Sequence, residues 1–445
     1  MARVAGSTYA DVNLGTEESP LAVALDPDRP FRILLVGDFS GRGWRDAAAP
    51  SLTPQPVDRD NIDEAMERCG VRVDLHGMNL AFRELDDFHP DRIYRAVPLF
   101  ADLDRLAARA ATPPPPPPAP AARAAAGGGL LDQMMAEETE RTRPATAEDA
   151  NDLAAFIRRV SLGSTVPRET PAQQQQQARR NALATEMMRE ILHHPRMQAI
   201  EAAWRAVFQL VRALDTGEDL KVYLLDLSLP EVIAHFDALR AELARKGPWG
   251  MIAGNYAFGQ SELDARVLAR LAGLARSAGA PFIAEARPPE GDPDPAWTQL
   301  RHSAAARWIG LALPRFLLRL PYGKDTSPVE SFPFEEMPVS EHACYLWGNP
   351  AFFCAQLIGQ SFLVYRWDLA KRLVRRIDGL PIHVYREDGE PTAKPCAEVL
   401  MSERDAETLL EAGFMPLASM KHQPAALIVR FQSIAEPAAA LAGLA

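Results

Sequence analysis

The chain has 445 residues, of which 47% are hydrophobic and 24% are charged, the composition of an ordinary globular protein of two or three domains. Its 59 acidic residues outnumber its 48 basic residues and give a formal net charge of −11. This balance argues against nucleic acid or an anionic membrane as a partner, because both need a basic surface. No apolar run is long enough to span a bilayer, no secretory leader is visible, and the four cysteines are scattered. We therefore expect a reduced, cytoplasmic protein without direct membrane insertion.

The first part of the chain has the pattern of a small α/β unit. The run from Phe31 to Gly37 is apolar and ends at a glycine, which predicts a buried strand. Asp60 is placed to cap a helix over 61–69. Pro90 suits the first turn of a further helix, and Pro98 should kink or divide that helix.

Residues 112–129 separate this unit from the rest of the chain. They include six consecutive prolines, Pro113 to Pro118, and end in three glycines. Polyproline is stiff and a glycine run is flexible, and such a segment cannot bury enough apolar surface to fold. We therefore predict a linker. A second polar tract, the glutamines at 173–177, is predicted to be a loop or a solvated stretch.

The second part of the chain is longer and alternates between helical and strand patterns. Residues 220–227 read as a buried strand, and Pro230 with Glu231 opens a helix through Leu243. A helix over 261–278 lies between two short apolar segments. This alternation predicts an α/β domain. Before the first strand runs a stripe with the spacing of an amphipathic helix, formed by Ile200, Trp204, Val207, Phe208, Val211 and Leu214.

Two glycine-containing segments invite a nucleotide-binding interpretation. The segment from Gly37 to Gly43 follows a strand, but it lacks the GxGxxG spacing and no GK[ST] follows. The pair Gly323-Lys324 lacks both the upstream glycine and the following Ser or Thr of a phosphate loop. Both segments are predicted to be turns in which glycines supply unusual backbone angles.

No constellation of catalytic or metal-ligating residues is visible. His193 and His194 are adjacent and would point about 100° apart on a helix, so we predict polar surface histidines rather than metal ligands. The pair Glu335-Glu336 is predicted to be solvated. Cys344 with its neighbouring histidine lacks a second cluster that would complete a zinc site. We expect no catalytic residue, no cofactor and no metal, and hence no enzyme.

Arg315 and Arg319 interrupt a dense run of leucines and aromatic residues. An unpaired buried charge is costly, so we expect acidic partners for both, either from the same subunit or from a neighbouring one.

Four long motifs stand in order in the second unit: HHPRMQAIEAAWRAVFQLVR from His193, DTGEDLKV from Asp215, LPRFLLRLPYG from Leu313 and YLWGNPA from Tyr345. The third motif continues into PVESF from Pro328. In sequence, order and spacing they resemble the large (TssC/VipB-like) subunit of the contractile sheath of bacterial type VI secretion systems. The resemblance covers roughly residues 130–430.

Three motifs of the first unit, VGDFSG from Val36, VDRDNIDE from Val57 and FRELDDFHPD from Phe82, resemble the small (TssB/VipA-like) sheath subunit. The chain thus resembles a fusion of both subunits. The resemblance implies a small N-terminal α/β unit joined by a Pro/Gly linker to a larger α/β sheath-type domain with a mixed sheet. The expected division is a small-subunit unit at 1–111, the linker at 112–129, a helical segment at 130–190 and a large-subunit core at 191–445. A fusion would raise the effective concentration of one half near the other.

The family motifs also suggest residues for assembly. The candidates are Asp38, Gly41, Arg59, Asp60, Trp204, Arg315, Arg319, Pro321, Tyr322, Gly323, Glu330, Trp347 and Gly348.

A short segment after the glycines matches the position at which the family carries a helix recognised by a hexameric AAA+ unfoldase (ClpV-like). Leu130, Leu131, Met134 and Met135 would form one apolar face of a helix, which suits a groove on a partner. The alternative is that this face packs within the chain.

We expect two departures from the family. The small-subunit part stops near Ala111, before the family's C-terminal helices, and the large-subunit part lacks the family's C-terminal domain, which takes part in strand exchange between subunits. The leading hypothesis is a structural sheath protomer that assembles with itself or with other sheath subunits around an inner tube protein on a baseplate, and contracts to export effectors. The alternative is a non-polymerising scaffold or baseplate adaptor derived from a sheath protein. A nucleotide-using α/β enzyme is less favoured, because the phosphate motifs are broken.

Overall fold

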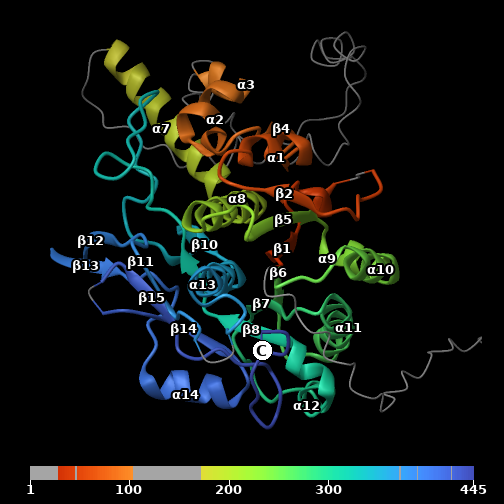
Figure 1. Cartoon of the computed structure of the whole chain (residues 1–445). Coiled ribbons are helices and arrows are strands. Elements are labelled where there is room, and N and C mark those ends of the chain that lie inside the picture. The colour runs from red at the N-terminus through yellow and green to blue at the C-terminus, as the bar shows by residue number, and fades with distance from the viewer. Residues whose placement is uncertain are drawn as a thin grey trace, which may run out of the picture.

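The computed structural model describes residues 29–45, 48–103, 172–369, 372–387, 389–421 and 423–444 (Figure 1). The predicted linker and the segment from Leu130 to Met135 lie outside these residues. Among the helices described, none is both long enough and apolar enough to cross a membrane.

A nine-stranded sheet forms the centre of the described part of the chain. Six neighbouring strands, from β14 to β5, pair in parallel, whereas β11, β15 and β2 add antiparallel pairs at the two edges. The predicted α/β class with a mixed sheet is therefore confirmed. In sheet order the strands are β11 (Arg376–Asp378), β15 (Ala425–Ile428), β14 (Met415–Ser419), β8 (Ile309–Leu313), β7 (Phe282–Ala286), β6 (Met251–Phe258), β1 (Phe31–Gly37), β5 (Leu220–Asp226) and β2 (Gln55–Val57).

The strand predicted from the first apolar run, β1, lies inside this sheet and not in a sheet of its own. It is flanked by β5 and β6, two strands of the second unit that follow each other along the chain. The two sequence units therefore share one sheet. Side chains of β1 alternate between its faces, so Ile33 and Leu35 enter one core and Leu34 and Val36 enter the other.

Helices cover both faces of the sheet (Figure 1). One face carries α8 (Pro195–Ala213), which contains the predicted apolar stripe, and α13 (Pro350–Tyr365). The other face carries α9 (Leu229–Ala234), α10 (Phe236–Lys246), α11 (Glu262–Ala278) and α12 (Pro295–Arg301). The helix predicted from Pro230 through Leu243 is in fact two helices, because the backbone of His235 leaves the helical region between α9 and α10.

The remaining elements of the first unit pack beside α8 and against α7 (Ala172–Leu192). Helix α2 ends at Ala96 and α3 begins at Pro98, so the predicted division at that proline is confirmed. The elements are the 3-10 turn Arg42–Trp44, α1 (Ile62–Cys69), β3 (Arg72–Leu75), β4 (Met78–Ala81), the 3-10 turn Leu85–Phe88, α2 (Pro90–Ala96) and α3 (Pro98–Ala101).

Small elements complete the second unit. Strands β9 (Phe316–Leu317) and β10 (Trp347–Gly348) pair with each other, and β12 (His383–Glu387) and β13 (Glu390–Lys394) form a separate hairpin. The others are the 3-10 turns Ala304–Trp308 and His342–Cys344 and helix α14 (Glu403–Glu411).

One local prediction was wrong, and another was right in part. Asp60 does not cap the helix that was predicted over 61–69, because α1 begins at Ile62 with Asn61 as its N-terminal flanking residue. The carboxylate of Asp58 instead accepts the main-chain N–H groups of Asp60 and Asn61, which makes a local turn in place of the cap. The glutamine tract was predicted to be a loop or a solvated stretch. It is the first part of α7 rather than a loop, because glutamine is itself a good helix former, and the exposed side chains of Gln174, Gln176 and Gln177 agree with a solvated stretch.

Candidate functional site at the joint between the two sequence units

Residues 29–103 and residues 172–444 meet in a region that we call the joint. Its centre is main-chain pairing, because β1 aligns with β5 along all seven of its residues and with β6 along four. Buried main-chain N–H and C=O groups need hydrogen-bond partners. Without β1, both β5 and β6 would present an unpaired edge in the middle of the sheet. The joint is therefore part of the core and not a contact between two finished domains.

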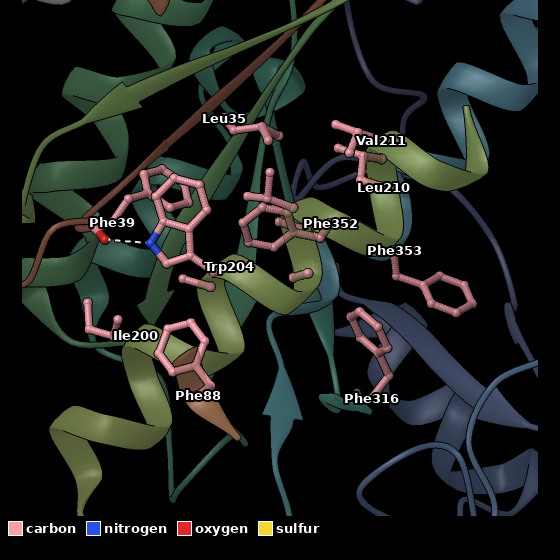
Figure 2. Packing of buried hydrophobic residues seen from close by; sticks show 14 of the residues in the cluster. Leu35, Phe39, Phe88, Ile200, Trp204, Leu210, Val211, Phe316, Phe352 and Phe353 are labelled. Carbon is pink, nitrogen blue, oxygen red and sulfur yellow. Dashed lines mark hydrogen bonds between the residues drawn. The ribbon is translucent and has the colours of Figure 1, made fainter. Parts of the chain in front are cut away.

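Trp204 attaches α8 to the end of β1. Its indole is fully buried, and Nε1 donates a hydrogen bond of 2.8 Å to the main-chain carbonyl of Phe39. The two rings meet edge-on with their centroids 5.8 Å apart, and Phe352 of α13 also meets Phe39 edge-on at 6.5 Å (Figure 2). A buried N–H without a partner would cost about 1–3 kcal/mol, so this bond helps to fix where the chain leaves β1 relative to α8.

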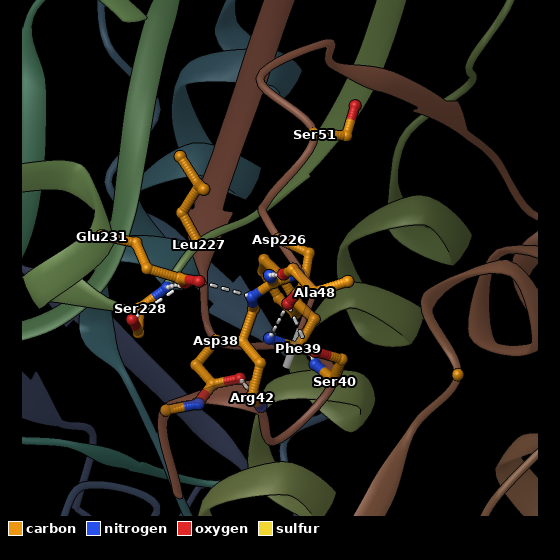
Figure 3. A network of polar contacts seen from close by, with 12 residues as sticks. Asp38, Phe39, Ser40, Arg42, Ala48, Ser51, Asp226, Leu227, Ser228 and Glu231 are labelled. Atoms are coloured by element: carbon orange, nitrogen blue, oxygen red, sulfur yellow. Dashed lines mark hydrogen bonds and ion pairs between the residues drawn. The ribbon is translucent and has the colours of Figure 1, made fainter. Parts of the chain in front are cut away.

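Strands β1 and β5 end side by side, but the chain leaves them toward opposite faces of the sheet. After β1, Phe39 packs into the core beneath α8, whereas after β5, Leu227 packs into the core that contains α10 and α11. In open α/β sheets the crevice between two such strand ends is the usual place for a ligand. In this protein, side chains from both sequence units meet there (Figure 3).

Arg42 occupies the crevice. Its Nε donates a hydrogen bond of 2.8 Å to Glu231 of α9, and its Nη1 lies 3.5 Å from the carboxylate of Asp226 at the end of β5. The Asp226 carboxylate also accepts the main-chain N–H groups of Phe39 and Ser40 at 2.8 and 3.0 Å. Burial would lower the pKa of Arg42, but the bonds and charges of Glu231 and Asp226 outweigh it and raise that pKa. Arg42 therefore remains a cation that ties the first unit to the second.

Asp38 closes the turn that follows β1. Its carboxylate accepts the main-chain N–H groups of Arg42 at 2.9 Å and of Gly43 at 2.8 Å, while burial, the largest cause, raises its pKa. Gly41 has φ of +77°, and a Cβ atom at that position would collide with the carbonyl oxygen of Arg72. Only glycine suits both demands. The predicted turn is confirmed, and its glycine is needed for packing rather than for binding phosphate.

A cavity of about 400 Å³ borders this crevice on the side of β2 and α1. Cys69 lines it, but burial raises the pKa of that thiol to about 12, so it is not a thiolate at neutral pH. The hydroxyls of Ser51 and Thr53 also line it, and the lining contains neither a histidine nor a lysine that could act as a base.

The second part of the joint is the segment 318–341, which we call the strap. Arg319 near its start lies 2.7 Å from Glu201 of α8 and 2.7 Å from Glu336 of the strap itself. Glu201 is 0% exposed and Glu336 is 1% exposed. Burial would raise the pKa of both carboxyls, but Arg319 outweighs it, so that the pKa of Glu201 is lowered and that of Glu336 falls to about 2. Both carboxyls therefore stay charged in the interior.

Further contacts extend this buried cluster. Arg205 lies 2.7 Å from Glu201 and donates a hydrogen bond of 2.8 Å to the hydroxyl of Tyr322. The main-chain N–H of Tyr322 donates to Glu336 at 2.7 Å, and Nε2 of His193 lies 3.4 Å from the same carboxylate. Such a cluster adds little net stability compared with an apolar core, but loss of one partner is costly. The cluster therefore specifies where the strap lies on α8.

The middle of the strap holds the first unit. The Asp91 carboxylate, at the start of α2, accepts the main-chain N–H of Ser331 at 2.8 Å and that of Glu330 at 3.1 Å. The ring of Tyr94 in α2 stacks on Phe332 with their centroids 5.1 Å apart. The strap thus connects α8 of the second unit with α2 of the first.

Comparison with known proteins identifies both parts of the joint. Residues 178–294 and 290–435, together more than half of the chain, match the VipB family, described as the tail sheath N-terminal domain. The chain belongs to the VipB tail sheath family. Residues 24–111 match the VipA family of the type VI secretion system, so that both kinds of sheath domain stand in one polypeptide.

One relative is similar over much of the second unit. The type VI secretion system sheath protein TssC1 of Pseudomonas aeruginosa is 33% identical over 300 residues, a match that covers 58% of this chain and 60% of the relative. This chain thus spans about 60% of the length of that sheath protein. The chain belongs to a family of structural sheath proteins, and this membership decides against the enzyme alternative. The joint is the contact between a VipA-type part and a VipB-type part.

The structure places most of the sequence candidates in the joint or next to it. Gly323 lies in a turn of the strap, as predicted, but its backbone angle is not one that requires glycine, and the atoms nearest to it belong to the exposed side chain of Glu335. Asp38 and Gly41 lie in the turn beside the crevice, Trp204 packs between α8 and the end of β1, and the strap holds Arg319, Pro321, Tyr322, Gly323 and Glu330.

Other candidates lie elsewhere. Trp347 and Gly348 form β10, and Arg315 donates a hydrogen bond of 2.8 Å to Glu398, so the acidic partner of this arginine comes from the same chain. Arg59 and Asp60 are exposed and lie 3.8 Å from each other, away from the joint.

Two predictions about polar residues were wrong. Glu336, predicted to be solvated, is buried because it pairs with Arg319. His193 and His194, predicted to be surface residues, are half-buried, and the ring of His194 accepts a main-chain hydrogen bond at the start of α8.

Sequence reasoning missed Asp226, Glu231 and Glu201 as members of the joint. A signal existed for the first two, since they stand at the end of a predicted buried strand and in the first turn of the next helix, where α/β proteins gather polar groups. Glu201 lies on the predicted apolar stripe of α8, and an acidic residue at such a position indicates a buried cationic partner.

Proposed function

We propose that this chain is a one-piece protomer of a type VI contractile sheath, in which the VipA-type and VipB-type parts are built as one folded body. It would polymerise around an inner tube and contract to drive effector export. The observation that supports this most directly is the place of β1, which the VipA-type part contributes to the middle of the VipB-type sheet. A joint made by a central strand cannot slide, so the two parts would move as one unit during contraction.

The partners follow from this role. The chain would assemble with further copies or with other sheath subunits in the cytoplasm, enclose an inner tube protein and start from a baseplate. Contraction would need two arrangements of the contacts between protomers that differ in stability, as in other bistable assemblies. No step requires a cofactor, a metal ion or chemistry within the protomer.

Electron microscopy of the purified full-length chain, with a sedimentation measurement on the same sample, tests the proposal. Hollow tubes or stacked rings are expected. A monodisperse monomer that stays so when the inner tube protein is added would contradict it and would favour a non-polymerising scaffold or baseplate adaptor.

We also propose that Leu130, Leu131, Met134 and Met135 bind the AAA+ unfoldase. The support is the position of this apolar pattern directly after the glycine run. The double variant Leu131→Asp with Met135→Asp is expected to abolish pull-down of the unfoldase, because a charge on the apolar face does not enter an apolar groove. The matched control is Gln133→Asp, which adds a charge off that face and should bind normally. Equal pull-down by the double variant and the wild type would refute this interaction.

A further inference from the structure

The β12–β13 hairpin forms a two-stranded sheet separate from the nine-stranded sheet (Figure 1). At its base, His383 of β12 pairs across the strands with Lys394 of β13. An isolated hairpin is only marginally stable in water, so its order depends on what it packs against. Both residues contact the body of the protein through a histidine. His383 does so through its own ring, and Lys394 contacts the ring of a histidine in the body.

The first contact runs through His342, in the 3-10 turn before β10. The ammonium of Lys394 lies 2.9 Å from its Nδ1, and a carboxylate oxygen of Glu398 lies 3.3 Å from its Nε2. An ammonium has only donors, so Nδ1 must accept and the ring must be neutral with its proton on Nε2. Nε2 then donates to Glu398. The arrangement requires the neutral imidazole.

The second contact runs through His383 itself. Its Nδ1 lies 2.7 Å from the hydroxyl of Tyr345, which also lies 3.0 Å from the hydroxyl of Ser340. Lys394 faces the rings of Tyr345 and Trp347 at 5.4 and 5.6 Å from their centroids. Burial lowers the pKa of His383, and the charge of Glu336 opposes that effect only in part. This histidine too is held in its neutral form when the hairpin is docked.

Protonation would break the first contact directly. A proton on Nδ1 of His342 would face the Lys394 ammonium at hydrogen-bond distance, which places two cations together and leaves no acceptor. The same charge would strengthen the bond from Nε2 to Glu398, so the histidine would stay and the lysine would leave. A charge on His383 would add repulsion, because Lys394 is its cross-strand neighbour.

We propose that His342 and His383 form a proton-operated latch, which holds the β12–β13 hairpin against the body of the protein when both rings are neutral and releases it when they are protonated. The docked hairpin covers Tyr345 and Trp347, which are 2% and 7% exposed. Release would uncover part of these aromatic surfaces and free the hairpin to take another position.

The direction of the pH response follows from the lowered pKa of His383. A histidine that is harder to protonate when docked contributes docking stability that is complete above its ordinary pKa of 6.5. That stability is lost as the pH falls from this value through the lowered one. Release is therefore an acid response.

Other charged groups near the two histidines could also change the pH response of the hairpin, so their effects must be distinguished from that of the latch. Glu398 is held by Arg315 in two hydrogen bonds, and Glu341 is the chain neighbour of His342. A third carboxyl near Glu398 is that of Glu285 on β7. Burial above all, together with the charge of Glu398, raises the pKa of Glu285 to about 7, although Arg315 acts in the opposite direction. Glu285 titrates in the same pH range, so the variant Glu285→Gln is needed as a control.

Hydrogen–deuterium exchange of the full-length chain, read by mass spectrometry between pH 7.5 and pH 5.5, tests the latch. Labelling times are scaled for the intrinsic pH dependence of exchange, and the buried amides of α11 serve as the internal reference. Peptides from the hairpin are expected to exchange faster at the lower pH, in the direction that the lowered pKa of His383 gives. Glu285→Gln and His235→Gln, the latter at an exposed histidine between α9 and α10, should keep this response.

Two variants make the outcome decisive. His342→Gln can still accept from Lys394 and donate to Glu398, so its hairpin should lose less protection at pH 5.5 than the wild-type hairpin, with His383 as the remaining source of the response. Lys394→Glu should reverse the response, because a protonated His342 would attract the new carboxylate while a neutral one would not hold it. A wild-type hairpin whose protection does not change with pH, or a normal acid response in both variants, would overturn the proposal.

Discussion

The main-chain N–H of Ser331 donates a hydrogen bond of 2.8 Å to the carboxylate of Asp91, which lies 240 residues earlier in the chain. One residue of the VipA-type part thereby binds the strap of the VipB-type part through two consecutive N–H groups, since Glu330 donates to the same carboxylate. Hydrogen bonds to a charged acceptor are about twice as strong as neutral ones. This contact therefore offers a direct measure of how the two parts hold together.

The substitution Asp91→Ala is expected to lower the free energy of unfolding by about 1–3 kcal/mol at pH 7, because two main-chain donors lose a charged acceptor. Urea unfolding measures this. Asp60→Ala is the matched control, since Asp60 is exposed and lies outside the joint. Equal losses in the two variants would show that Asp91 does not hold the strap.

The same contact predicts a dependence on pH. Burial would raise the pKa of Asp91, but the hydrogen bonds from Ser331 and Glu330 outweigh it, so that the pKa lies below its ordinary value of 3.8. The stability that Asp91 contributes is therefore complete above that value and is lost as the pH falls through the lowered pKa. The difference between wild type and Asp91→Ala should shrink below about pH 4. A constant difference down to pH 2 would contradict this assignment.

Trp204 separates packing from hydrogen bonding in the joint. Trp204→Ala should destabilise the fold by about 3–5 kcal/mol, because it empties a fully buried site. Trp204→Phe keeps a ring but leaves the carbonyl of Phe39 without its donor, and should cost less. Trp44, which is 41% exposed, is the control, and Trp44→Ala should leave the stability of the fold nearly unchanged. Thermal melting by circular dichroism would show the ranking, and a neutral Trp204→Ala would contradict the core assignment.

The elements of the joint could be predicted from the sequence, but their pairing could not. The apolar run and final glycine predicted β1, and the 3.6-residue stripe predicted α8, because local sequence determines both patterns. The position of β1 between β5 and β6 depends on strands from the other unit, and periodicity contains no information about that. The sequence therefore suggested two separate units where the structure has one sheet.

The same limit applies to the buried charges. The sequence predicted that Arg319 needs an acidic partner, since an isolated charge is costly in an apolar run. It could not choose Glu201, which is 118 residues away, and it assigned Glu336 to the surface because adjacent glutamates are usually solvated. Partner choice in such clusters depends on three-dimensional proximity.

Arg319 is the centre of the buried cluster, so its removal should be severe. Arg319→Met keeps much of the side-chain volume but leaves Glu201 and Glu336 buried without this partner, at an expected cost of about 3–5 kcal/mol. The control is Arg59→Met, at an exposed position where the loss should be below about 1 kcal/mol. Adding Glu201→Gln and Glu336→Gln to Arg319→Met should recover part of the stability. If the triple variant were no more stable than the single one, unpaired charge would not be the cause.

Because β1 lies in the middle of the sheet, we expect the two parts of the chain to fold only together. A fragment of residues 130–445 would expose the facing edges of β5 and β6, and unpaired edges in the middle of a sheet favour aggregation. We expect this fragment to show no cooperative melting by circular dichroism, and co-expression with residues 1–111 to restore it. Deletion of Pro113 to Pro118 from the full chain should leave the melting temperature unchanged if these residues form a linker, because the contacts described in the joint lie between residues 29–103 and 172–444. A fragment that melts cooperatively at the temperature of the full chain would show that β1 is dispensable to the sheet.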